Sequence, residues 1–149
     1  MKRLMLLPLL LSSVFALAHE GGHEPRFEEM TRESGPMAPV ILASEAALGP
    51  KAALVYKAEL VRSEDGGVTI FLYDSAQKPL KLADLSAKAK ATVQTVKKGK
   101  TTKAPFELTL RSESSYVGMA PKAARKPYTI EVTFSEGKRK LSSVFENLY

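Results

Sequence analysis

Two histidines near the start of the chain are the residues best suited to chemistry. They lie in the segment HEGGH at residues 19–23, and the sequence contains no other histidine. If the chain is cleaved after Ala18, His19 gains a free α-amine, and this amine and the imidazole Nδ1 can chelate one metal ion. The two glycines between the histidines let the chain turn back and bring His23 to the same ion. Three nitrogens with Glu20 or water suit tetragonal copper(II), so His19, Glu20 and His23 are the predicted metal ligands.

The first residues have the order typical of a secretory signal peptide. Lys2 and Arg3 precede a mostly apolar run at residues 4–17, and small residues follow around Ala18. This run is shorter than the ~20 residues that a membrane-spanning helix needs. We therefore expect residues 1–18 to be removed, and the mature protein to be periplasmic or secreted without a transmembrane segment.

Composition excludes several classes of protein. The chain has no cysteine, so it can form no disulfide, iron–sulfur cluster or thiolate metal site. Both histidines lie beside the expected cleavage site, which excludes a Ser-His-Asp triad within the folded part. Asp65, Asp74 and Asp84 fall in predicted turns, where aspartate bonds to the backbone. We therefore expect a protein that is not an enzyme. Met30, Met37 and Met119 are scattered possible ligands for copper(I), although we expect Met119 to pack in the core.

Basic residues outnumber acidic ones, and the formal net charge of the chain is +6. Their clusters are consistent with a surface for nucleic acid or anionic lipid, or with solvated turns. We favour solvated turns because each cluster lies in or beside a predicted loop, and we expect no nucleic-acid partner. The clusters are Lys97, Lys98, Lys100 and Lys103; Lys122, Arg125 and Lys126; and Lys138, Arg139 and Lys140.

Short apolar runs with a period of two predict β-strands along most of the chain. In residues 106–111 and 128–135, apolar side chains alternate with polar ones, as in a sheet with one buried and one solvated face. Residues 88–93 and 68–72 also have an apolar side chain at every second position. Turn sequences such as residues 64–67 separate the runs and favour antiparallel pairing, which predicts an all-β sandwich.

We divide the chain into three parts on these patterns. Residues 1–18 are the signal peptide, and residues 19–38 form a flexible tail that contains histidine, glycine and proline. Residues 39–149 form the folded domain. Residues 52–62 fit either a helix or a strand, and we favour a strand because their apolar positions alternate. Residues 44–48 fit one helical turn, with Ser44 as its cap and Gly49 as its end, and residues 141–148 fit a last strand.

One row of side chains suggests a docking surface. Thr69, Phe71 and Tyr73 lie opposite the inward-facing row of their strand and are unusually apolar for a solvated face. An exposed aromatic row on a strand can bind a partner protein. The alternative, which we favour, is that a neighbouring loop or the N-terminal segment covers the row.

Several motifs together resemble a loosely defined group of small exported bacterial proteins. They include residues 72–74 and 78–80, the run KAKATV at residues 88–93, the strand at residues 106–110 and Pro127 before a strand. The resemblance implies one immunoglobulin-like β-sandwich behind a histidine- and glycine-containing N-terminus. It also implies an envelope setting, often beside heavy-metal efflux systems.

The chain is also similar to periplasmic copper carriers, which are β-sandwiches whose mature chain begins with histidine. Only His19 matches that feature, because those carriers use a second histidine from the folded body and none is present here.

The resulting hypothesis is a non-enzymatic periplasmic accessory protein. It binds copper(II) through His19, Glu20 and His23 and works beside envelope metal-efflux components. The alternative is a protein-interaction or structural module of the envelope without a metal role, whose strand edge or face at Phe71 and Tyr73 binds a partner.

Overall fold

A computed structural model describes residues 32–149 of the chain. The predicted metal ligands His19, Glu20 and His23 lie outside these residues. The described part forms eight strands and one short 3-10 helix: β1 (Met37–Leu42), η2 (Ala43–Lys51), β2 (Tyr56–Arg62), β3 (Gly67–Tyr73), β4 (Lys88–Lys97), β5 (Lys100–Ser112), β6 (Ser115–Met119), β7 (Tyr128–Glu136) and β8 (Arg139–Leu148). The prediction of an all-β protein is therefore confirmed.

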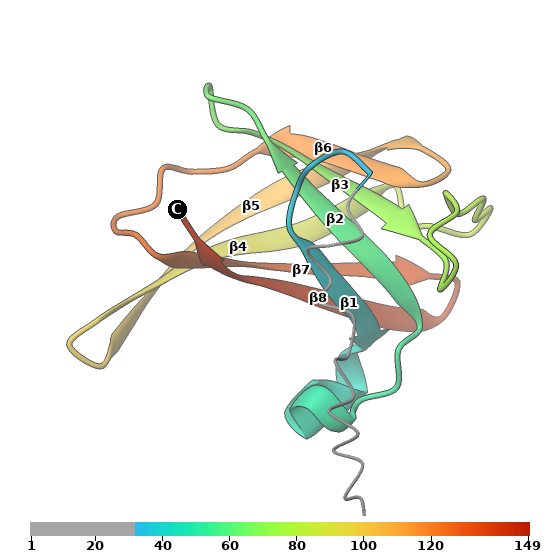
Figure 1. Ribbon diagram of the computed structural model, residues 1–149, viewed down its shortest axis with the longest axis horizontal. Coiled ribbons are helices and arrows are strands. Elements are labelled where there is room, and N and C mark those ends of the chain that lie inside the picture. The colour runs from blue at the N-terminus through green and yellow to red at the C-terminus, as the bar shows by residue number, and fades with distance from the viewer. Residues whose placement is uncertain (1–31) are drawn as a thin grey trace, which may run out of the picture.

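The strands form a single closed barrel, in the order β1-β2-β3-β6-β5-β4-β7-β8, and every neighbouring pair is antiparallel. Figure 1 shows the strands wrapping around one interior. The predicted immunoglobulin-like β-sandwich is therefore wrong. The physical reason is that alternation reports only that each strand buries one face, and both architectures require this. They differ here in the pairing of the first strand with the last, which no local pattern encodes.

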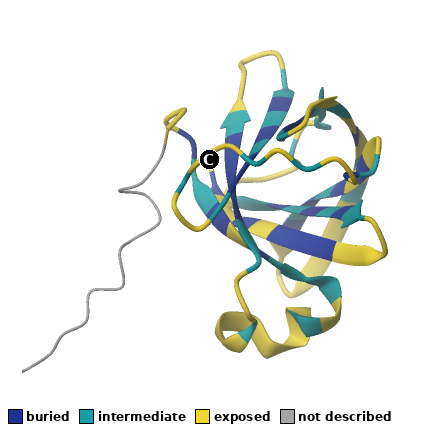
Figure 2. Cartoon of the chain, turned by 90° about the vertical axis from the view of Figure 1, so that its right-hand side faces the viewer, coloured by how far each residue is buried: buried dark blue, intermediate teal, exposed yellow. Residues whose placement is uncertain are grey.

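The barrel interior is filled by the inward-facing rows of the strands. Figure 2 shows buried and less buried residues alternating along several strands. The rows predicted from residues 68–72, 88–93 and 128–135 all contribute buried apolar side chains. The largest fully buried apolar side chains come from six strands: Tyr116, Phe145, Leu60, Ile70, Leu72, Leu108, Ile130 and Leu141. A small eight-stranded barrel of this kind has a packed core rather than a channel.

The structure gives the secondary structure of the segments that fitted more than one element. The strand expected in residues 52–62 is confirmed, although β2 begins only at Tyr56. The helical turn expected at residues 44–48 is part of η2, which starts after Leu42 and is interrupted at Gly49, where φ is +54°. The last strand is confirmed as β8. The first strand, β1, begins at Met37.

The connections between strands gather at two ends of the barrel. The turns β2–β3 and β4–β5, the β6–β7 loop at residues 120–127 and the C-terminus share one end, on the left of Figure 1. The β3–β4 loop and the turns β5–β6 and β7–β8 share the other. At the first end, residues 95–102 extend past the last residue of β4 that pairs with β7, and we call them the β4–β5 arm.

Closure of the barrel can be tested by cross-linking, because the chain has no cysteine of its own. Ile41 and Ser142 lie opposite each other across the pairing of β1 with β8. Opposite residues in such a pair have Cα atoms about 4.5–5.5 Å apart, within the range of a disulfide. We expect the double variant Ile41→Cys, Ser142→Cys to form an intramolecular disulfide on mild oxidation, measured by mass spectrometry.

In the matched control, the second cysteine is placed on the next strand instead of at Ser142. Thr133 of β7 pairs with Ser142, so it lies two strand spacings, about 9–10 Å, from Ile41. The variant Ile41→Cys, Thr133→Cys should therefore remain reduced. An open sheet between β1 and β8 would leave both variants without the disulfide.

Candidate functional site

A buried carboxylate joins the start of the described chain to the barrel. Glu59 on β2 is fully buried. It accepts hydrogen bonds from the backbone N–H groups of Arg32 at 3.1 Å, Glu33 at 2.9 Å and Gly35 at 2.9 Å. The hydroxyl of Tyr73 donates a fourth bond, at 3.1 Å. A carboxylate has about four acceptor positions, so this set satisfies the group and offsets the cost of burying it.

The segment bound by Glu59 packs directly on β2, and we call residues 32–36 the anchor segment. Its Pro36 carbonyl accepts a hydrogen bond of 3.0 Å from the backbone N–H of Leu60. Gly35 is buried, and a Cβ atom added there would lie 2.1 Å from the carbonyl oxygen of Leu60. Only glycine fits such a close approach of two backbones, so this residue allows Glu59 to reach the anchor segment.

The predicted docking row lies beside this carboxylate on the outer face of β3. Tyr73 is only 3% exposed, and the guanidinium of Arg32 lies 6.0 Å from the centre of its ring. Burial raises the pKa of the Tyr73 hydroxyl well above its ordinary value, and its hydrogen bond to Glu59 adds to this effect. Phe71 pairs with Glu59 and is partly buried. The anchor segment thus covers Tyr73 and leaves part of Phe71 accessible.

Glu59 was not identified from the sequence as a candidate site residue. By alternation along β2, the side chain of Glu59 points out of the barrel, and an outward-facing glutamate is ordinarily solvated. The available signal was indirect, since the apolar row on the neighbouring strand implied that some segment covers this face. Sequence alone did not show that the covering segment presents backbone N–H groups, which need hydrogen-bond acceptors and here find them in the Glu59 carboxylate.

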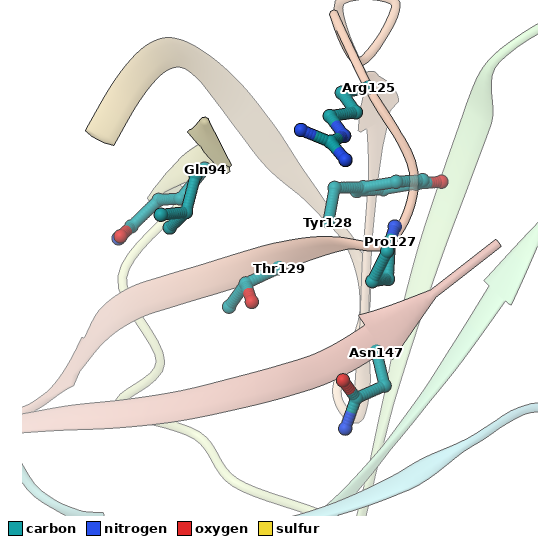
Figure 3. Close-up of a pocket in the computed structure, with 7 residues that line it drawn as sticks. Gln94, Arg125, Pro127, Tyr128, Thr129 and Asn147 are labelled. Carbon is teal, nitrogen blue, oxygen red and sulfur yellow. The ribbon is translucent and has the colours of Figure 1, made fainter. Parts of the chain in front are cut away.

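A second feature is a groove of about 280 Å³ on the surface at the end of the barrel that carries the C-terminus. In the view of Figure 3, Arg125 lies above Tyr128, and Thr129 and Asn147 lie below it. The groove is lined by residues of β4, the β6–β7 loop, β7 and β8: Gln94, Val96, Arg125, Pro127, Tyr128, Thr129 and Asn147.

Polar contacts fix the walls of this groove. The side-chain amide of Gln94 donates a hydrogen bond of 2.6 Å to Glu131. The guanidinium of Arg62 lies 5.6 Å from the ring centre of Tyr128 and donates to its hydroxyl. Arg62 also donates to the carbonyl of Tyr149 at 3.0 Å, which holds the C-terminal residue at this end. These contacts fix the side chains of Gln94 and Tyr128, and Arg125 supplies a cation to the lining of the groove.

The residue types of the described part limit which metal ligands it can supply. Residues 32–149 contain neither histidine nor cysteine, and no group of three or more carboxylates gathers among them to hold a metal. The predicted turn roles of two aspartates are confirmed, since Asp65 accepts a hydrogen bond from the Gly67 N–H and Asp74 from the Lys78 N–H. Met119 is 60% exposed, so its expected place in the core is wrong.

Comparisons with known proteins add no further guide to function. The chain matches no protein-family model, and no similar protein was found among curated proteins or solved structures. The resemblance to small exported metal-associated proteins therefore stays a prediction. Within residues 32–149, no helix has the length and apolar character needed to cross a membrane.

The raised pKa of Tyr73 predicts how stability depends on alkaline pH. Unfolded tyrosine ionises near pH 10, whereas Tyr73 keeps its proton to higher pH in the folded protein. The unfolded state therefore binds fewer protons above pH ~10, and the free energy of unfolding falls as pH rises from there. Burial also raises the pKa of Tyr56 and Tyr116, which add to this fall.

In the variant Tyr73→Phe, we expect a shallower fall above pH ~10, together with a loss of about 1 kcal/mol at neutral pH from the missing hydrogen bond. Urea unfolding at a series of pH values measures both effects. The same alkaline slope in the variant and the unchanged protein would contradict the buried, hydrogen-bonded position of this hydroxyl.

Proposed function

We propose that this protein is a non-enzymatic binding protein of the cell envelope, in which the barrel carries an N-terminal copper(II) site. The ligands are the α-amine and imidazole of His19, the imidazole of His23, and Glu20 or water. Copper(II) has the highest affinity of the divalent first-row ions for such nitrogen donors. Envelope metal-efflux components are the partners this role implies.

The observation that supports this proposal is the set of hydrogen bonds to Glu59. These bonds attach residues 32–35 to the side of the barrel, so the chain that precedes Arg32 begins at a defined place. A rigid attachment suits a protein that presents a metal site to a partner. The packed barrel interior offers no comparable place for a ligand, because large apolar side chains fill it.

A non-enzymatic role also fits the residue types of the folded part. Histidine and cysteine are both missing from residues 32–149. These residues therefore cannot supply a cysteine nucleophile, or a histidine that would activate a serine or threonine hydroxyl.

The alternative is an interaction module, and one observation favours it. Residues 100–107 of β5 pair with β4, while pairing with β6 begins only at Leu108, so one side of this strand segment is open. The N–H of Leu110 points to the β4 side, toward Ala87, and by alternation the N–H position of residue 105 faces the open side. Residue 105 is proline, which has no N–H to donate, and such residues protect edges against strand addition. We therefore rank this alternative second.

Copper(II) affinity of the processed protein tests the proposal. We expect the protein that begins at His19 to bind copper(II) at least about tenfold more tightly than the same chain with one alanine added before His19, because the extension removes the α-amine from the chelate. Competition with a chromogenic chelator measures both affinities. The variant Glu59→Gln serves as a control, since its change lies outside the ligand set and should leave the affinity unchanged.

Equal and weak binding by the two chains would contradict the copper site and leave the interaction module as the better proposal. A different processed N-terminus, found by intact mass, would also remove the proposed chelate. A loss of affinity in Glu59→Gln would show that the barrel contributes to the metal site.

A further inference from the structure

Two of the three basic clusters meet at one end of the barrel. Val96 brings the β4–β5 arm to one wall of the groove, beside Gln94 of β4, while Arg125 and Pro127 bring the β6–β7 loop to the other. The arm and the loop therefore lie on the same side of the molecule (Figure 1). We call the exposed cations of these two segments, together with Lys103 directly after the arm, the basic end: Lys97, Lys98, Lys100, Lys103, Lys122, Arg125 and Lys126.

The basic end accounts for the positive charge of the whole chain. The formal net charge of the chain is +6, or +4 without Lys2 and Arg3, while the basic end alone carries +7, so the other residues of the processed chain together carry −3. Neither ion pair among the described residues involves the basic end, since they join Lys88 to Glu107 and Arg139 to Glu136. Seven like charges on adjoining segments repel one another, and an anionic partner relieves that repulsion.

The third cluster provides an internal comparison. Lys138, Arg139 and Lys140 lie in the β7–β8 turn at the opposite end of the barrel. There Arg139 is paired with Glu136, which also accepts a hydrogen bond from the hydroxyl of Tyr56. Solvated turns, the interpretation favoured from sequence, therefore fit this cluster, whereas the basic end is a concentrated surface.

Large apolar side chains are exposed at the same end as these cations. Val96 is 62% exposed directly before Lys97 and Lys98. Met119 is 60% exposed directly before the β6–β7 loop, and Tyr149 is 70% exposed at the C-terminus. Cations mixed with exposed apolar and aromatic side chains are typical of surfaces that bind the interface of a membrane, where charge and apolar contacts act together.

We infer that the basic end docks on an anionic phospholipid surface. The lysines and Arg125 contact headgroup phosphates, and Val96, Met119 and Tyr149 insert among the headgroups. A nucleic acid or an acidic protein matches the charge but gives no reason for exposed valine and methionine beside it. This surface shares no residue with the contacts of Glu59 or with the predicted copper ligands, so the inference stands or falls independently of the proposed function.

Binding to vesicles tests the inference. We expect the full processed protein to co-sediment with phosphatidylcholine vesicles that contain phosphatidylglycerol, and to bind pure phosphatidylcholine vesicles much more weakly. A lysine near an anionic surface contributes about fivefold to affinity. Replacing Lys97, Lys98, Lys100 and Lys103 with glutamine should therefore weaken binding by at least about tenfold.

The control variant makes the same change of charge at the opposite end. Lys78, Lys81, Lys138 and Lys140 are all exposed there, and their replacement with glutamine should change binding by less than about threefold. The variant Val96→Ser tests the apolar part, and its binding should weaken even where added salt screens the charges. Circular dichroism of each variant confirms that the barrel is folded.

The other outcomes overturn the inference. Equal losses in the two lysine variants would mean that overall charge, rather than the basic end, attracts the vesicles. Binding of polyaspartate or of an oligonucleotide without binding of anionic vesicles would identify an acidic polymer as the partner class. Binding of inorganic phosphate in the groove without vesicle binding would identify a small-anion site. Binding to none of these probes would leave the basic end as a solvated surface.

Discussion

The pairing of β1 with β8 is the constraint on which the barrel depends. It is a short seam, in which residues 40–42 lie opposite residues 141–143. The other side of β1 pairs with β2 over residues 37–40, so only Val40 pairs with both neighbouring strands. Immediately before β1, Glu59 binds the anchor segment through backbone N–H groups. The first strand is therefore held on both sides and at its start, which compensates for the shortness of the closing seam.

The sequence was sufficient for the strands but not for their closure. Alternating side chains predicted the inward rows of β3, β4 and β7, because a half-buried strand requires them. The pairing of residues about a hundred positions apart leaves no periodic signal, so the sandwich and the barrel were equally compatible with the pattern. The prediction of a sandwich followed from resemblance and strand spacing, and both describe local features.

The candidate sites show a similar division. The apolar row at Phe71 and Tyr73 was visible in the sequence, whereas Glu59 was not, because its partners are backbone groups of a segment more than twenty residues earlier. The basic clusters were visible as well. The sequence did not show which of these clusters lie together in the fold. The β6–β7 loop crosses one end of the barrel and brings its cluster beside that of the β4–β5 arm. Metal binding by His19 and His23 stays a prediction from sequence.

The barrel thus separates two surfaces by its architecture. The anchor segment lies on the outer faces of β2 and β3 beside Glu59 and Tyr73, while the arm and the β6–β7 loop form the basic end. The two surfaces have no residue in common, and neither ion pair of the described residues joins them. Metal binding before the anchor segment and lipid binding at the basic end are accordingly expected to be independent.

Amide hydrogen exchange of the anchor segment tests most directly whether it belongs to the folded barrel. If Glu59 binds it as described, the amides of Glu33 and Gly35 exchange nearly as slowly as those of β2, since they open only when the carboxylate is released. The replacement Glu59→Gln should then accelerate exchange at these two amides while the protection of β3 and β7 persists. Exchange of Glu33 and Gly35 at the rate of an unstructured peptide in the unchanged protein would contradict the attachment of the N-terminal segment to the barrel.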